Sequence, residues 1–177
     1  MDDSPAPPSS GDAVPELVDI VDEHDRVVEV VPRARMRAER LLHRCVFIAV
    51  VHPDGRLLVH QRSPHKDIWP GWWDLAVGGV VSAGEGYDDA ARRELAEEVG
   101  IVAAIPEPLD DGTAQRYVDD DVALMGRCYR VVHLGPFTFA DGEVVQARFV
   151  GRAELAELLA TEPFLPDSRA LLLPLLG

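Results

Sequence analysis

The segment 79–101 constrains the chain more than any other, because it puts three glutamates on one side of a predicted helix. Residues 87–99 carry apolar side chains at helical spacing. At 100° per residue, Glu94, Glu97 and Glu98 fall within an arc of about 100°. The apolar residues of the neighbouring arc are Ala91, Leu95 and Val99. The three carboxylates therefore lie at the edge of the helix face that we expect to be buried.

The charge of this acidic cluster permits two interpretations. Acidic residues on a helix commonly form a solvated face, and Arg93 stands four residues before Glu97, where the two can form a salt bridge. Glu94 is, however, a like-charge neighbour of both Glu97 and Glu98, and each such pair costs roughly 0.2–0.5 kcal/mol in an isolated helix. A bound divalent cation would reverse the sign of that interaction, and oxygen ligands at this density favour Mg²⁺ or Mn²⁺.

The spacing of glycines, glutamates and arginine in this segment resembles the Nudix box, G-x5-E-x7-R-E-U-x-E-E-x-G-U, in which U is a bulky aliphatic residue. Every specified position is matched, by Gly79, Glu85, Arg93, Glu94, Leu95, Glu97, Glu98, Gly100 and Ile101. The order of predicted strands from about Leu17 onward is also similar to that family. The resemblance implies an α/β (α+β) chain that folds as a Nudix α/β/α sandwich with a mixed β-sheet.

The resemblance also implies a reaction, the Mg²⁺- or Mn²⁺-dependent hydrolysis of the diphosphate linkage in a nucleoside diphosphate-X or related small organic diphosphate. The groups that would hold the metal are the backbone carbonyl of Gly78 and the side chains of Glu85, Glu94, Glu97 and Glu98. Glu85 would support either the loop or the metal shell. Arg93 would orient the glutamates, so the implied catalytic residues are Arg93, Glu94 and Glu97. The chemistry agrees, because a bound cation neutralises the phosphates and lowers the pKa of a water, whose proton a carboxylate removes.

The general base that accepts this proton has several candidates. Glu94 is one of them. Many Nudix enzymes take the base from a later loop, which makes Asp119, Asp120, Asp121 and Glu143 the others. For the aspartate run, an ordinary solvated turn is an equally good interpretation.

Substrate contacts are predicted from charge and aromatic character. The predicted substrate-binding residues are Arg62, Lys66, Trp73, Asp119, Asp121 and Glu143. Arg62 and Lys66 would supply positive charge near a phosphate. Trp73 belongs to a group of three tryptophans, with Trp69 and Trp72, that could stack on a base, although packing in the core is at least as good an interpretation.

A second resemblance concerns the isopentenyl-diphosphate isomerase branch of Nudix proteins. The similar segments are 41–50, 57–63, 65–74 and 78–85. That isomerase uses a cysteine and histidine metal ligands, and the corresponding positions here hold Gly78, Val80 and Met36. His43 alone remains, and it is explained equally well as a hydrogen-bonded histidine at a strand entry. Cys45 lies in a predicted core strand, where a cysteine is usually inert. We therefore expect a hydrolase on an isomerase-like scaffold, not an isomerase.

Two alternative functions are retained beside the hydrolase. The first is an isopentenyl-diphosphate isomerase-like enzyme, against which the missing cysteine argues. The second is a non-catalytic Nudix module that binds a ligand. A degraded box is the usual mark of such a module, and the box of this chain is complete.

Composition limits the partners. The 177 residues include 31 acidic and 17 basic side chains and two cysteines, and the net charge is −14. Such a surface repels nucleic-acid phosphates and anionic lipid headgroups. No apolar run is long enough to span a bilayer, so we expect a cytoplasmic monomer or homodimer without nucleic-acid or membrane partners. The Pro-, Ser- and Asp-rich residues 1–15 are expected to be a disordered tail, and 16–177 a single Nudix domain.

Hydrophobic periodicity predicts interleaved strands and helices. Strands are expected in a hairpin within 17–31 and over 44–51, 56–62, 102–108, 113–118, 122–133 and 144–150. Helices are expected over 32–43, 87–99, 152–160 and 168–176.

Overall fold

The computed structural model describes residues 14–139 and 142–177, so the predicted tail lies almost entirely outside the described residues. In chain order the elements are β1 (Leu17–Val21), β2 (Val27–Pro32), α1 (Arg33–Glu39), β3 (His43–Val51), β4 (Leu57–Arg62), β5 (Trp73–Asp74), α2 (Tyr87–Val99), β6 (Glu107–Pro108), η1 (Asp110–Gly112), β7 (Gln115–Val118), β8 (Ala123–Val132), β9 (Val144–Val150), α3 (Arg152–Thr161), α4 (Pro166–Leu171) and η2 (Leu173–Leu176). Among the described residues, no helix has both the length and the apolar character needed to cross a bilayer.

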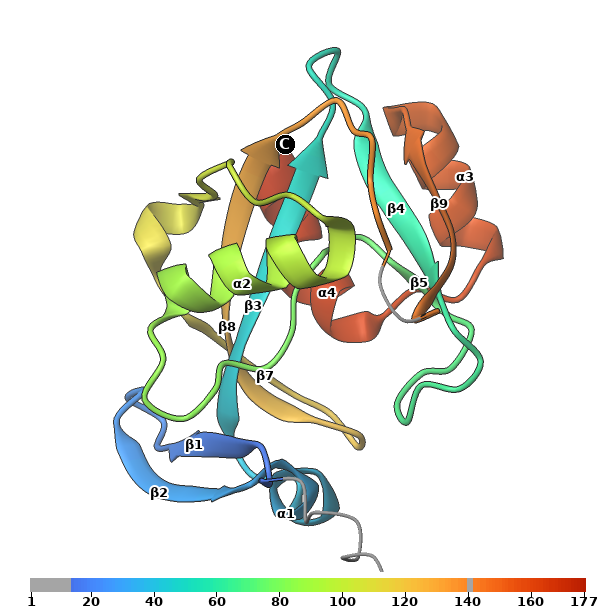
Figure 1. Cartoon of the computed structure of the whole chain (residues 1–177). Helices are drawn as coiled ribbons and strands as arrows, with labels where there is room; N and C mark the ends of the chain where they lie inside the picture. The colour runs from blue at the N-terminus through green and yellow to red at the C-terminus, as the bar shows by residue number, and fades with distance from the viewer. Residues whose placement is uncertain (1–13, 140–141) are drawn as a thin grey trace, which may run out of the picture.

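A mixed sheet forms the centre of the molecule (Figure 1). Strands β3 and β8 run parallel over their full contact, from His43 opposite Leu124 to Val51 opposite Val132. The other pairs are antiparallel, including the predicted β1–β2 hairpin and the pair of β4 with β9. The predicted mixed sheet is thus confirmed.

Strand β3 is buried on both faces, and its residues alternate between two apolar clusters. Cys45, Phe47, Ala49 and Val51 belong to the first cluster, and Val46, Ile48 and Val50 belong to the second. Helix α2 covers the second cluster, whereas residues of α1, α3 and α4 pack against the first. Helices therefore cover both faces of the sheet, as the α/β/α sandwich requires.

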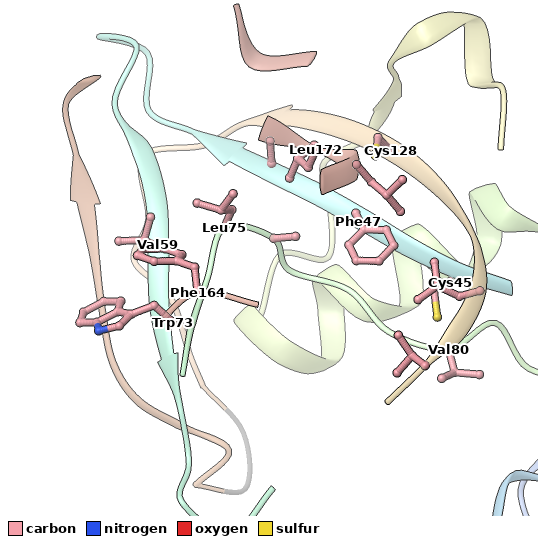
Figure 2. Close-up of a cluster of buried hydrophobic side chains, with 14 of the residues drawn as sticks. Cys45, Phe47, Val59, Trp73, Leu75, Val80, Cys128, Phe164 and Leu172 are labelled. Carbon is pink, nitrogen blue, oxygen red and sulfur yellow. The ribbon is translucent and has the colours of Figure 1, made fainter. Parts of the chain in front are cut away.

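The first cluster contains Trp73, which the sequence offered as a substrate contact. Figure 2 shows Trp73 beside Phe164, and their rings stack with centroids 6.3 Å apart. The Trp73 residue is 4% exposed. Its side chain therefore serves the core, which was the alternative interpretation of this tryptophan.

Strands β3 and β4 pair only at the hairpin end, where Val51 lies opposite Leu57. Beyond that end they diverge (Figure 1). The chain that follows β5 crosses from β4 to β3, where it is hydrogen-bonded through Val77 and Gly79 to the backbone of β3. This divergence brings the crossing segment 75–82 under helix α2 and opens the space in which the site lies.

Three predicted elements differ from the structure. The helix expected over 32–43 ends at Glu39, and its last predicted residue, His43, begins β3. The strand expected over 102–108 is reduced to Glu107 and Pro108, because the chain leaves α2 at the surface, where Val102 is 82% exposed. The helix expected over 168–176 begins earlier, at Pro166, and ends at Leu171, before a short 3₁₀ helix. Pro174 explains the break, since proline has no N–H to donate and its ring clashes with the preceding turn.

Candidate active site

A cavity of about 760 Å³ lies where β3 and β4 diverge, within the size range of small-molecule sites. Helix α2 contributes Arg93, Glu94, Glu97 and Glu98 to its lining. The opposite side is lined by Arg37 of α1, Arg62 of β4, and Asp167 of α4. The cavity therefore has an acidic wall facing a wall that is rich in arginine.

Arg93 is hydrogen-bonded to three glutamates at the acidic wall. Its Nε and Nη2 atoms donate to the two carboxylate oxygens of Glu85, each at 2.9 Å. Its Nη1 atom donates to Glu94 at 2.7 Å and to Glu97 at 3.1 Å, and Nη2 also reaches the carbonyl oxygen of Val80 at 3.2 Å. The predicted Arg93–Glu97 salt bridge is thus present as one part of a larger network.

Glu85 supports the loop in this network. Its second carboxylate oxygen also accepts the N–H of Ser82 at 3.0 Å. Burial opposes ionisation of Glu85, but the hydrogen bonds from Arg93 and Ser82 hold its pKa below the usual value. Glu85 does not line the cavity. Of the two roles implied for it, these hydrogen bonds favour support of the loop.

Positions 78 and 79 require glycine because the crossing segment lies very close to β3 and to Glu94. A Cβ atom on Gly78 would lie 2.0 Å from the carbonyl oxygen of Val46, and a Cβ atom on Gly79 would lie 2.7 Å from Glu94 Oε1. The N–H of Gly78 donates to Glu98 Oε2 at 3.3 Å. No side chain fits at position 78 of this structure, so a cysteine could not stand here in the place that it has in the isomerase.

The two inner glutamates are held in a setting that disfavours their charge. Burial raises the pKa of Glu94, although Arg93 opposes the shift. Burial and the neighbouring charge of Glu94 raise the pKa of Glu98 to about 8. Glu97, with a side chain 61% exposed, stands at the mouth of the cavity. Glu94 and Glu98 are therefore neighbouring carboxyl groups with too little positive charge nearby to neutralise both.

This donor set fits a hard divalent cation. Glu94 and Glu98 are one helical turn apart, and the carbonyl oxygen of Gly78 accepts no hydrogen bond from any described residue. Within 14–139 and 142–177, no three His, Cys, Asp or Glu side chains already converge at metal-binding distances. Arg93 holds Glu94 and Glu97 instead, so a cation would bind by replacing part of that network.

The predicted substrate residues divide into two groups. Arg62, Lys66 and Glu143 line the cavity, and Lys66 forms an ion pair with Glu143. Asp119 and Asp121 do not line it. Asp119 accepts the backbone N–H groups of residues 121 and 122, as in an ordinary turn. Trp73 also lies outside the cavity lining.

Of the three tryptophans that could stack on a base, Trp69 lies at the cavity. It lines the cavity, stacks on Trp72 with ring centroids 6.4 Å apart, and donates its indole N–H to Asp121 at 3.1 Å. Asp121 thus contributes indirectly, by positioning an aromatic wall. No local pattern separates the two tryptophans, because Trp73 is buried through the pairing of β5 with β4, where it lies opposite Gln61.

His60, Asp74 and Asp167 form a further wall that sequence reasoning missed. All three are buried, and all line the cavity. Burial, with the charge of Asp74 nearby, raises the pKa of Asp167 to about 7. Burial lowers the pKa of His60, which keeps the imidazole neutral. These residues come from β4, β5 and α4, so no local motif could have joined them.

The remaining isomerase-related residues are inert by geometry. His43 is 1% exposed, and its Nδ1 atom is 2.8 Å from the carbonyl oxygen of Leu41. Burial lowers its pKa to about 4. Cys45 is buried, and burial raises the pKa of its thiol to about 12, so no thiolate is available at neutral pH.

Comparison with known proteins shows the family to which a chain with this fold, cavity and acidic helix belongs. The NUDIX domain model matches residues 41–172. An uncharacterised Nudix hydrolase of Streptomyces coelicolor is 40% identical over 159 residues, which cover 86% of this chain and 83% of that protein. The uncharacterised Nudix hydrolase YfcD of Escherichia coli is 35% identical over 153 residues, covering 86% and 82%. The chain belongs to the Nudix family, and its enzyme class is that of the Nudix pyrophosphohydrolases.

Solved structures agree on the fold. The crystal structure of DR0079 from Deinococcus radiodurans has a TM-score of 0.74 and 26% identity, and the match covers 90% of this chain and 99% of that chain. The NUDIX domain of Shewanella oneidensis NrtR, determined in complex with ADP ribose, has a TM-score of 0.54 and 22% identity, and the match covers 80% and 94%. The predicted fold class is thereby confirmed.

Gly79→Ala should separate the roles of packing and catalysis. The added methyl group would meet the flexible end of Glu94, so we expect the protein to fold while its hydrolytic activity falls about 100-fold, as for a misplaced catalytic group. Gly151→Ala is the matched control, because nothing lies within 4 Å of a Cβ there. Steady-state hydrolysis and thermal denaturation of both variants check this expectation, and full activity of Gly79→Ala would contradict it.

Asp167→Asn should change how stability depends on pH. The pKa of Asp167 is raised from 3.8 to about 7, so its contribution to stability is full below pH 3.8 and is lost as the pH rises through 7. Asparagine does not ionise, so the stability of the variant relative to the native protein should increase over this window, by at most about 1.4 kcal/mol per pH unit. Urea denaturation of both proteins from pH 4 to pH 8 measures this difference, and a constant difference would refute the shift.

Proposed function

We propose that this chain hydrolyses the diphosphate linkage of a nucleoside diphosphate-X or a related small organic diphosphate, with Mg²⁺ or Mn²⁺ as cofactor. The observation that carries the proposal is the acidic wall itself. Three glutamates of one helix, with Arg93 between them, face a cavity of about 760 Å³ that also holds Arg62 and Lys66. Acidic and basic groups that converge on one cavity suit an anionic substrate that arrives with a cation.

The proposed metal-binding groups are Glu94, Glu97, Glu98 and the carbonyl oxygen of Gly78. A divalent cation held there supplies neutralisation of the phosphate charge and a lowered pKa for water. Arg93 sets the orientation of Glu94 and Glu97 through its paired hydrogen bonds. The Gly78 N–H holds Glu98 in the cavity wall. These contacts hold the glutamates at the cavity until a cation replaces part of the Arg93 network.

Two of the candidate general bases line the cavity. Glu94 is buried, and burial raises its pKa above the usual value, which makes it a stronger proton acceptor than an exposed glutamate. Glu143 is exposed and paired with Lys66. The aspartates at 119–121 lie outside the lining. Glu94 is therefore the base that the geometry supports best, and Lys66 and Arg62 are proposed to steady the phosphates on the opposite side.

A nucleotide substrate is supported by an aromatic wall and by analogy of fold. Trp69 presents a ring to the cavity and is fixed by Trp72 and Asp121. A flat aromatic surface of this kind can stack on a base. The NrtR NUDIX domain, which shares the fold, binds ADP ribose. ADP ribose therefore belongs in the substrate panel, with nucleoside di- and triphosphates, nucleotide sugars, dinucleoside polyphosphates, coenzyme A and isopentenyl diphosphate.

Glu97→Gln and Glu98→Gln test the proposal most simply. Each variant replaces one carboxyl group, the proposed metal ligand, by an amide of the same shape, so we expect at least about 100-fold loss of Mg²⁺-dependent hydrolysis on the best panel substrate. Glu157→Gln, on the exposed surface of α3, is the matched control and should retain full activity. Product release is measured with and without Mg²⁺. Retained activity in both cavity variants, or hydrolysis unaffected by chelation of the metal, would disprove this account.

A further inference from the structure

The arginine-rich wall of the cavity is only partly neutralised. Besides Arg93, the basic side chains that line the cavity are Arg33, Arg37, Arg62 and Lys66. Arg33 pairs with Glu16 at 2.9 Å, and Lys66 pairs with Glu143. Neither of the two remaining arginines forms an ion pair with a described residue. They are the cations whose charge is left for a ligand.

Arg37 and Arg62 reach the cavity from α1 and β4 with unused donors. In the part of the chain that the structure describes, the half-buried guanidinium of Arg37 makes no hydrogen bond. Arg62 donates from Nη2 to the carbonyl oxygen of Ile68 at 3.2 Å, while its Nε atom is buried without a partner. Leaving a buried guanidinium donor without an acceptor is costly. The arrangement therefore fits a ligand that supplies the missing oxygen atoms.

The two guanidinium groups also repel each other. Burial lowers the pKa of Arg37, and the charges of Arg33 and Arg62 lower it further. Asp167 is the carboxyl group that acts on both Arg37 and Arg62. Because burial raises its pKa to about 7, Asp167 carries only part of a negative charge near neutral pH. Asp74 lines the cavity beside Asp167 and offsets part of the charge of the two arginines, but neither carboxyl group forms an ion pair with Arg37 or Arg62 in the described residues.

From these contacts we infer that Arg37 and Arg62 form an oxyanion subsite that does not require the metal, and that Arg37 is a specificity-determining residue for a phosphate or carboxylate group of the substrate. A guanidinium binds such groups through two parallel N–H···O hydrogen bonds. The subsite stands on α1 and β4, across the cavity from the glutamates of α2. That the bound group belongs to the substrate rests on the proposed function, whereas binding of an oxyanion does not.

Inorganic phosphate is the probe that tests the subsite directly. It is titrated into the full-length protein in EDTA, and the tryptophan fluorescence is followed because Trp69 lines the cavity. We expect saturable binding to the native protein and at least about tenfold weaker binding to Arg37→Gln. Arg35→Gln is the matched control: Arg35 lies on the same helix, pairs with Glu29 and Glu39, and does not line the cavity. It should bind phosphate within about twofold of the native protein.

Arg37→Lys is a second, more conservative variant, which distinguishes loss of the contact from a folding defect. It keeps the positive charge and loses only the planar guanidinium group with its paired donors. It should bind phosphate with an affinity between those of the native protein and Arg37→Gln. Thermal denaturation shows whether each variant is folded. The inference is overturned if the native protein shows no saturable binding, if Arg37→Gln and Arg37→Lys both bind as tightly as the native protein, or if Arg35→Gln loses as much affinity as Arg37→Gln.

A substrate pair identifies the source of the oxyanion. UDP-glucose and UDP-glucuronate differ in one carboxylate at the end remote from the nucleoside. If the subsite takes a phosphate of the diphosphate group, Arg37→Gln raises KM for both about equally; if it takes a second anionic group, only KM for UDP-glucuronate rises. Unchanged KM for both substrates contradicts the specificity role. If neither substrate is hydrolysed by the native protein, the proposed function fails for this class, and the phosphate titration still decides whether the subsite exists.

Discussion

The close approach of the Gly78–Gly79 backbone to helix α2 is the contact on which the site depends. Gly78 donates its N–H to Glu98, and Gly79 leaves only enough room for the carboxylate of Glu94. Arg93 closes the contact from the other side by reaching the carbonyl oxygen of Val80. A side chain on Gly78 would clash with the backbone of Val46 in β3, and a side chain on Gly79 would displace the carboxylate of Glu94. Apolar packing holds α2 against the sheet, and the two glycines allow the crossing segment to come close enough to fix the carboxylates of Glu94 and Glu98.

This placement brings acidic side chains together on one side of the cavity, and the arginines lie together on the other side. Glu94 and Glu98 share the acidic wall, and their burial raises the pKa of both. Arg37 and Arg62 share the opposite wall, where Asp167 neutralises them only in part. Each wall therefore becomes more stable when an ion of opposite charge binds. A substrate that carries phosphate and arrives with a divalent cation would satisfy both walls at once, which is how we propose that a chain of net charge −14 binds an anion.

The acidic half of the site could be predicted because it is local in sequence. Helix α2 was predicted over the residues that form it, since its apolar period is regular and Gly100 ends it in the left-handed conformation, with φ 74°. The box residues lie within one segment of 23 positions, 79–101. Spacing alone therefore predicted that Glu94, Glu97 and Glu98 share one side of the helix.

The other half of the cavity could not be predicted, because it joins elements that are distant in the chain. Asp167 of α4 acts on Arg37 of α1, although the two residues lie near opposite ends of the described chain. The choice between Trp69 and Trp73 needed the strand register, which buries Trp73 opposite Gln61. The aspartate run at 119–121 resembled a catalytic loop but forms a turn beside the cavity.

The central claim is that the buried acids of α2 form a binding site for a divalent cation. Titration of Mn²⁺ into the metal-free protein, with free Mn²⁺ followed by electron paramagnetic resonance, tests this claim without any substrate. The account predicts saturable binding to the native protein and at least about tenfold weaker binding to Glu94→Gln, with Glu157→Gln unchanged. Absence of saturable Mn²⁺ binding, or equal affinity in Glu94→Gln, would show that the acidic wall serves the ion-pair network of Arg93 alone.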